Sequence, residues 1–149
     1  MKKILVLLFL TISVNVIAQI HNPVTWKTNI VKISDTECEL IAKATIEDGW
    51  HLYSQLVPEN GPVPTKFIFI GNGNYLKKGN TKEDEGHTVD DPIFNMEITY
   101  FGDVAEFKQR IKLKTKENFI VKAIVEFMVC NDSQCLPPNE VDLEFNVIQ

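Results

Sequence analysis

The stretch Phe119-Ile-Val-Lys-Ala-Ile-Val-Glu-Phe-Met-Val-Cys130 carries an apolar side chain at every second position. In an extended strand, successive side chains point to opposite faces of the sheet, so this spacing gathers one apolar set on one face. The other face is more mixed and ends at Cys130. The pattern predicts a strand over 119–130 that turns one face toward a core. The apolar set is Val121, Ala123, Val125, Phe127 and Val129.

The same two-residue period continues through much of the chain, and no segment after residue 18 shows a convincing helical period. About eight short strands at intervals of about ten residues predict an all-β fold, an antiparallel β-sandwich. A closed barrel is the alternative, because it uses the same alternation. Regular alternation covers 37–47, 107–113 and 141–147, and weaker β-like segments cover 24–33, 50–57, 65–70 and 96–101.

The N-terminus has the composition of a secretory signal peptide. Met1-Lys-Lys is followed by an apolar run over 4–14 and by the small-residue end Val16-Ile-Ala18. We expect cleavage near Ala18, which leaves 19–149 as a single exported domain; an uncleaved membrane anchor is the alternative. The 149 residues have a formal net charge of −5, and cleavage would remove two lysines. Such an acidic chain is a poor match for nucleic-acid phosphates.

The segment 79–92 is polar and acidic. We expect it to form a long loop, which serves either as a functional element or as a solvated excursion.

Two of the three cysteines lie in Val129-Cys-Asn-Asp-Ser-Gln-Cys-Leu-Pro-Pro138. The polar spacer favours a turn, so the sulfurs of Cys130 and Cys135 can meet. A loop this short stabilises a fold by only about 2 kcal/mol in the chain-entropy model. Spacing alone leaves both a redox pair and a structural turn clamp open.

The remaining cysteine, Cys38, falls on the apolar face of its segment and is expected to be a core residue. A Cys38–Cys130 bridge is disfavoured, because Cys130 alternates out of phase with the apolar set of its own strand. The three histidines are scattered without metal-ligand spacing, so we expect neither a metal nor a cofactor. Zinc held by the cysteine pair and one histidine is a third hypothesis.

Three segments together resemble the N-terminal periplasmic domain of the bacterial thiol:disulfide interchange protein DsbD, a family also labelled disulfide bond corrector. They are Gly49-Trp-His-Leu-Tyr-Ser-Gln55, the turn Gly61-Pro-Val-Pro-Thr65 before Phe67-Ile-Phe69, and 129–138 with its two cysteines. The resemblance extends from about residue 24 to the end of the chain. It implies an immunoglobulin-like antiparallel β-sandwich.

The resemblance also implies a site. Cys130 and Cys135 would be the catalytic redox pair. From its place after the turn, we expect Cys135 to be the more buried of the two. His51 and Tyr53 match aromatic positions that flank the pair in the family. Asp91 and Phe94 fall where the family has an acidic residue and an aromatic cap over the disulfide.

The partners implied by the resemblance are proteins with reactive thiols. A membrane thiol reductase or a thioredoxin-like protein would donate electrons, and exported thiol–disulfide proteins would accept them, in the periplasm or another exported location. A stand-alone domain would meet its donor in trans. The rival hypothesis is a non-catalytic β-sandwich that binds a protein partner, with the disulfide only clamping a loop.

Overall fold

The computed structural model describes residues 21–149, so the predicted signal peptide over 1–18 lies outside the described residues. The described chain is built of strands and turns, and it includes no helix that is long and apolar enough to cross a membrane. The strands are β1 (Val24–Ser34), β2 (Glu37–Ile46), β3 (His51–Tyr53), β4 (Lys66–Ile70), β5 (Tyr75–Glu83), β6 (His87–Asp91), β7 (Met96–Phe101), β8 (Val104–Leu113), β9 (Phe119–Phe127), β10 (Val129–Cys130) and β11 (Asn139–Val147).

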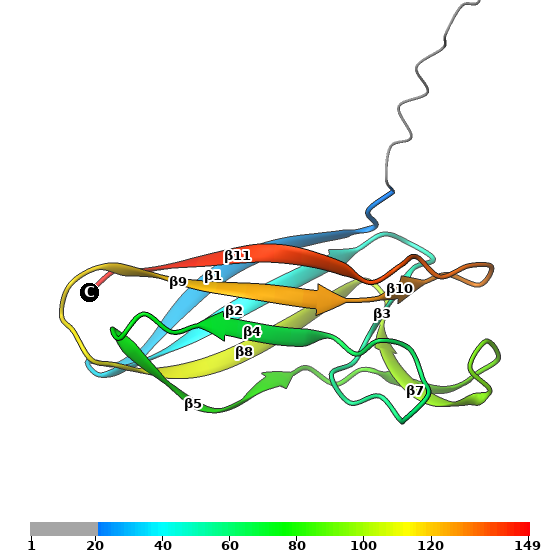
Figure 1. The fold of residues 1–149 in the computed structure, drawn as a ribbon, viewed down its shortest axis with the longest axis horizontal. Coiled ribbons are helices and arrows are strands. Elements are labelled where there is room, and N and C mark those ends of the chain that lie inside the picture. The colour runs from blue at the N-terminus through cyan, green and yellow to red at the C-terminus, as the bar shows by residue number, and fades with distance from the viewer. Residues whose placement is uncertain (1–20) are drawn as a thin grey trace, which may run out of the picture.

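Two long antiparallel sheets form the body of the molecule. One has the strand order β1-β2-β8-β5 and the other has the order β11-β9-β4, and Figure 1 shows them running along the long axis. The two sheets remain separate, so the fold is the predicted immunoglobulin-like sandwich rather than a closed barrel.

The core between these sheets consists of the alternating sets read from the sequence. On β2, the side chains at Cys38, Leu40, Ala42, Ala44 and Ile46 are all buried, and on β9 the predicted set from Val121 to Phe127 is buried as well. Four aromatic rings meet in the middle with centroids 5.0–5.8 Å apart, a spacing typical of favourable aromatic contacts. These rings belong to Trp26, Phe67, Phe107 and Phe127.

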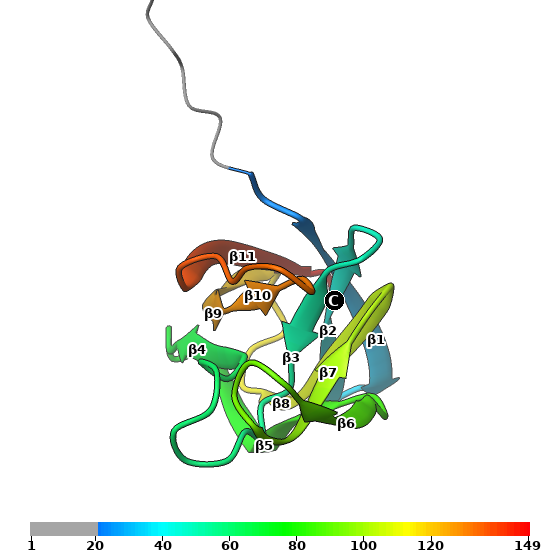
Figure 2. The same cartoon turned by 90° about the vertical axis from the view of Figure 1, so that its right-hand side faces the viewer.

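A third sheet, ordered β10-β3-β7-β6, lies at one end of the molecule. Figure 2 looks onto this end, with β3 and β7 side by side and β10 and β6 flanking them. Its strands are short, and one of its faces carries a small cluster of buried residues separate from the main core. This end carries the cysteine pair.

The expectation of one long loop over 79–92 is wrong. This segment contains the end of β5 and all of β6, joined by only three residues, 84–86. Strand β5 pairs with β8 as an edge strand, and its register shifts between Lys78 and Lys82. Because most of its side chains are exposed on both faces, it shows no alternation.

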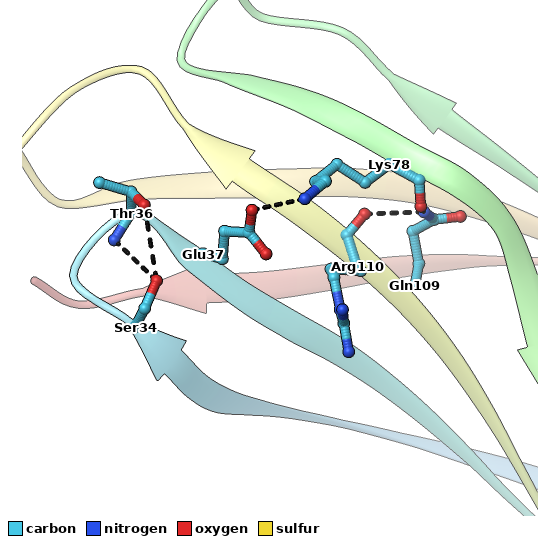
Figure 3. A network of polar contacts seen from close by, with 6 residues as sticks. All are labelled: Ser34, Thr36, Glu37, Lys78, Gln109 and Arg110. Atoms are coloured by element: carbon cyan, nitrogen blue, oxygen red, sulfur yellow. Dashed lines mark hydrogen bonds and ion pairs between the residues drawn. The ribbon is translucent and has the colours of Figure 1, made fainter.

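The buried side chain of Gln109 explains how the irregular part of β5 is held. Its amide donates hydrogen bonds to the carbonyl oxygens of Lys78 and Gly79 and accepts one from the Thr81 hydroxyl. Gly79 has a φ of +67°, which favours glycine at this point of the bulge. Figure 3 shows Gln109 against the Lys78 backbone and the Lys78 side chain reaching Glu37 on β2.

The strand predicted over 119–130 is interrupted. Strand β9 ends at Phe127, and β10 starts at Val129 and pairs with β3 instead of β11. The break at Met128 moves Cys130 out of the long sheet and into the end sheet.

Candidate functional site

Cys130 and Cys135 form a disulfide across a narrow turn, with their Cα atoms 4.0 Å apart. The Asn131 side-chain oxygen accepts hydrogen bonds from the backbone N–H groups of Ser133 and Gln134, which closes the turn predicted from the polar spacer. The backbone bonds Asn131 N to Gln134 O and Leu136 N to Val129 O flank the two cysteines. The pair therefore occupies a non-hydrogen-bonded position, where facing Cα atoms lie closest.

The two cysteines differ in burial, in the opposite order to the expectation. Cys130 is 1% exposed, whereas Cys135 is only partly buried. Cys130 pairs with His51 of β3 and so belongs to the sheet, while Cys135 joins the fold through an isolated bridge to Cys130. The expectation that Cys135 is the more buried cysteine is wrong because it ignored this pairing.

The third cysteine is not part of the site. Cys38 is a buried free thiol in the main core, as predicted, and burial raises the pKa of this thiol. The disfavoured Cys38–Cys130 bridge is not formed.

The disulfide rests on a second, smaller cluster. Tyr53, Ile98 and Cys130 are its fully buried members. Sequence reasoning missed most of the residues around them, although Met96, Ile98 and Tyr100 occupy alternate positions of β7 and could have been recognised as one face. The partly buried residues that pack against the cluster are Val57, Phe94, Met96, Tyr100, Met128 and Cys135.

Tyr53 is buried beneath this end, and its backbone oxygen accepts a 2.6 Å hydrogen bond from the Thr65 hydroxyl. Burial, and secondarily the charge of Asp91, raise the pKa of the Tyr53 phenol well above its ordinary value. The Tyr53 ring meets Phe94 edge to face, with centroids 6.0 Å apart. Tyr53 therefore stays protonated and supports the site from below by packing against its neighbours.

Asp91 and Phe94 belong to the turn between β6 and β7. One carboxylate oxygen of Asp91 accepts hydrogen bonds from the N–H groups of Ile93 and Phe94, at 2.8 and 3.1 Å. The Asp91 carbonyl accepts a third from Asn95, which adopts a φ of +53°. The buried Asp91 carboxylate thus shapes a tight turn that places Phe94 against the disulfide cluster.

His51 lies on the same sheet face as the cysteine pair. It is the cross-strand neighbour of Cys130, and its ring stacks on Tyr100 with centroids 4.1 Å apart. A surface pocket is lined by both His51 and Cys130 together with Asp91 and Asp132. The structure therefore brings all six residues singled out from the sequence to one end of the molecule.

A polar network fixes the chain where it leaves β3. The Ser54 hydroxyl donates to the Glu83 carboxylate, which also accepts from the backbone N–H of Gln55 at 2.9 Å.

Within residues 21–149, no group of three or more His, Cys, Asp or Glu side chains is placed to hold a metal ion.

Comparison with known proteins points to one family. The family model for the N-terminal part of thiol:disulfide interchange protein DsbD matches residues 22–146. The fold is similar to the N-terminal periplasmic domain of ScsB from Proteus mirabilis, with a TM-score of 0.56 and 12% identity over 85% of this chain and 47% of that chain. No curated protein sequence matches.

It is also similar to a chain in the complex between the DsbD N-terminal and PilB N-terminal domains from Neisseria meningitidis. That comparison has a TM-score of 0.52 and 15% identity over 86% of this chain and 87% of that chain. At such low identities, these two similarities show the fold alone.

Proposed function

The chain belongs to the family of the N-terminal domain of thiol:disulfide interchange protein DsbD, and on that premise we propose that it relays electrons between exported proteins through Cys130 and Cys135. The observation that carries the proposal is the disulfide itself. It closes a short loop at a solvent-facing end, where it contributes little to stability and one sulfur remains partly exposed.

The proposed chemistry is thiol–disulfide exchange. A thiolate of the donor attacks the Cys135 sulfur, because Cys135 is the more exposed of the pair. The Cys130–Cys135 bond breaks, the electron pair stays on Cys130, and a mixed disulfide joins Cys135 to the donor. Attack by a second donor thiol on that mixed disulfide releases the donor in oxidised form and leaves two reduced cysteines here. The reduced pair then passes two electrons to the disulfide of an acceptor by the same steps.

The proposed partners follow from the family. A thioredoxin-like domain or a membrane thiol reductase supplies the electrons, and exported thiol–disulfide proteins receive them. Support comes from the Neisseria structure, in which a DsbD N-terminal domain is in complex with a PilB N-terminal domain. The proposed location is the periplasm, in keeping with the periplasmic ScsB domain and with the predicted signal peptide.

In this proposal Phe94 acts as the cap. Its ring packs against the cluster that contains Cys130, and it is held by a tight turn rather than by a long flexible loop, so uncovering the cluster would require the β6–β7 turn to move. Asp91 contributes by holding that turn.

Trapping of a mixed disulfide tests the proposal. Cys130→Ser leaves the exposed Cys135 thiol. This thiol should form a stable mixed disulfide with a purified thioredoxin-like domain whose single active cysteine is activated as a disulfide with thionitrobenzoate, because Cys135 attacks that sulfur and thionitrobenzoate leaves. Cys135→Ser leaves the buried Cys130 and should trap much less. Cys38→Ser, which keeps the pair, is the matched control and should give no stable mixed disulfide. Equal absence of a mixed disulfide for both pair variants would contradict the relay and favour the non-catalytic binding module.

A further inference from the structure

The chemistry proposed for the disulfide leaves a problem at Cys130. When the Cys135 sulfur is attacked, the bond electrons collect on Cys130, whose side chain is 1% exposed and lies with Tyr53 and Ile98. A thiolate in an apolar environment is disfavoured, because it loses its hydration without a compensating partner. Some group next to Cys130 must stabilise or protonate the departing sulfur if exchange is to be fast.

Among the described residues, the structure places a group with suitable chemistry directly opposite Cys130 in the sheet. His51 is the cross-strand partner of Cys130 in the antiparallel pair of β3 and β10. Side chains of directly opposed residues leave the sheet on the same face, with Cβ atoms about 5 Å apart. His51 and Cys130 also line the same surface pocket, so no strand separates them.

The position of the His51 ring is set by its contact with Tyr100. It stacks on Tyr100 at an interplanar angle of 27°, and His87 approaches the same tyrosine at 6.0 Å. His51 is only partly buried, and it forms no ion pair within residues 21–149.

The other charged and titratable groups around His51 are engaged in other contacts, neutral or exposed. The carboxylate of Asp91 is engaged by two backbone N–H groups of its own turn, and Asp132 is exposed in the disulfide loop. Tyr100 supports the ring, Tyr53 lies below as a neutral phenol, and His87 is exposed beyond Tyr100. No lysine or arginine lines the pocket that contains Cys130.

We propose that His51 is the proton donor and electrostatic partner of Cys130 in thiol–disulfide exchange. This role rests on the proposed relay. In its protonated form His51 stabilises the thiolate that leaves the disulfide, or gives it a proton and becomes neutral. In the reverse step neutral His51 takes the proton from the Cys130 thiol as its sulfur re-forms the disulfide. The rate of exchange should therefore depend on pH, because the imidazole acts in its protonated form in one direction and in its neutral form in the other.

The test measures reduction of the disulfide by a single small thiol, glutathione, in the full chain and in His51→Gln. Taking the ratio of the two rates at each pH cancels the ionisation of glutathione itself. We expect His51→Gln to be about tenfold slower near pH 5.5 and to approach the wild-type rate near pH 8.5. His87→Gln is the matched control, because His87 touches the same tyrosine but does not line the pocket, and its ratio should be flat.

Two further measurements separate this role from packing. His51→Phe keeps a ring on Tyr100 without a titratable group, so it should slow exchange as His51→Gln does; a wild-type profile for His51→Phe would show that only stacking matters. In reduced Cys135→Ser, the fraction of Cys130 present as thiolate at neutral pH should fall about tenfold when His51 is replaced by Phe.

The outcomes separate the two proposals. If glutathione reduces the wild-type disulfide and the ratio for His51→Gln is independent of pH, the role of His51 is refuted while the relay stands. If the wild-type pair is not reduced at any pH, the relay is refuted and the role of His51 falls with it.

Discussion

The two buried regions of this molecule differ in size and in what covers them. The main core lies between two long sheets and holds most of the buried aromatic and aliphatic side chains. The cluster under the disulfide has three fully buried members, and partly exposed residues cover it. Burial of apolar area stabilises a fold roughly in proportion to the area, so the free energy of unfolding comes mainly from the first region. The second region contributes less to stability, and it contains the disulfide.

Removing a ring from the main core should have the largest effect on stability. Phe107 is 1% exposed and contacts Trp26, Phe67 and Phe101. Phe107→Ala should lower the free energy of unfolding by about 3–5 kcal/mol, through lost burial and a cavity. Urea denaturation measures this. A loss of unfolding free energy of only about 1 kcal/mol for Phe107→Ala would contradict the claim that the main core supplies most of the stability.

A close backbone contact in the end sheet, just before β6, gives the next prediction. A Cβ at Gly86 would lie 2.7 Å from a Thr99 methyl and 2.9 Å from the Tyr100 carbonyl oxygen, which cannot move without disturbing β7. Gly86→Ala should therefore cost about 1–3 kcal/mol of unfolding free energy. Gly102→Ala, whose Cβ meets nothing within 4 Å, is the control for thermal denaturation. Equal melting temperatures for the two variants would refute the contact.

Removing the proposed cap should separate stability from reactivity. Phe94 is only partly buried, so Phe94→Ala should cost about 1 kcal/mol or less. If the Phe94 ring packed against this cluster acts as the proposed cap, the rate of reduction by glutathione should rise several-fold in the variant. An unchanged rate would mean that Phe94 only packs. Phe119→Ala, also partly buried but next to Tyr75, is the matched control and should leave the rate unchanged.

The smallest effect should appear only in alkaline solution. The pKa of Tyr53 is raised in the folded state, so the folded chain holds this proton more tightly than the unfolded chain. Stability from this group is complete below about pH 10 and is lost as the pH rises above that value. Tyr53→Phe should therefore flatten the alkaline fall of the unfolding free energy. A fall as steep as in the wild type would place its cause elsewhere, for example at Tyr75, whose pKa burial also raises.

The main core could be predicted from the sequence because alternation is a local signal. Strands β2, β9 and β11 have one buried face each, which leaves a period of two in the chain. Strand β5 could not be predicted. It is an irregular edge strand whose side chains are mostly solvated, and its bulge is held by Gln109 from β8, a partner far along the chain.

The site shows the same division. The cysteine pair and its polar turn are local, so the disulfide could be proposed from spacing. The relative burial of Cys130 and Cys135 depends on the pairing of β10 with β3, between residues far apart in the sequence, and the local pattern suggested the wrong order. The same pairing sets His51 opposite Cys130.

The most direct test of the account is the reduction potential of the Cys130–Cys135 pair in the full chain. Equilibration with redox buffers, followed by alkylation and mass spectrometry, gives the oxidised fraction at each potential. An exchangeable pair should be half-reduced at a potential less negative than about −300 mV, where exported partners can exchange with it. A pair that stays oxidised well below that value would be a structural clamp, and the proposal that the disulfide at the end sheet takes part in thiol–disulfide exchange would be wrong.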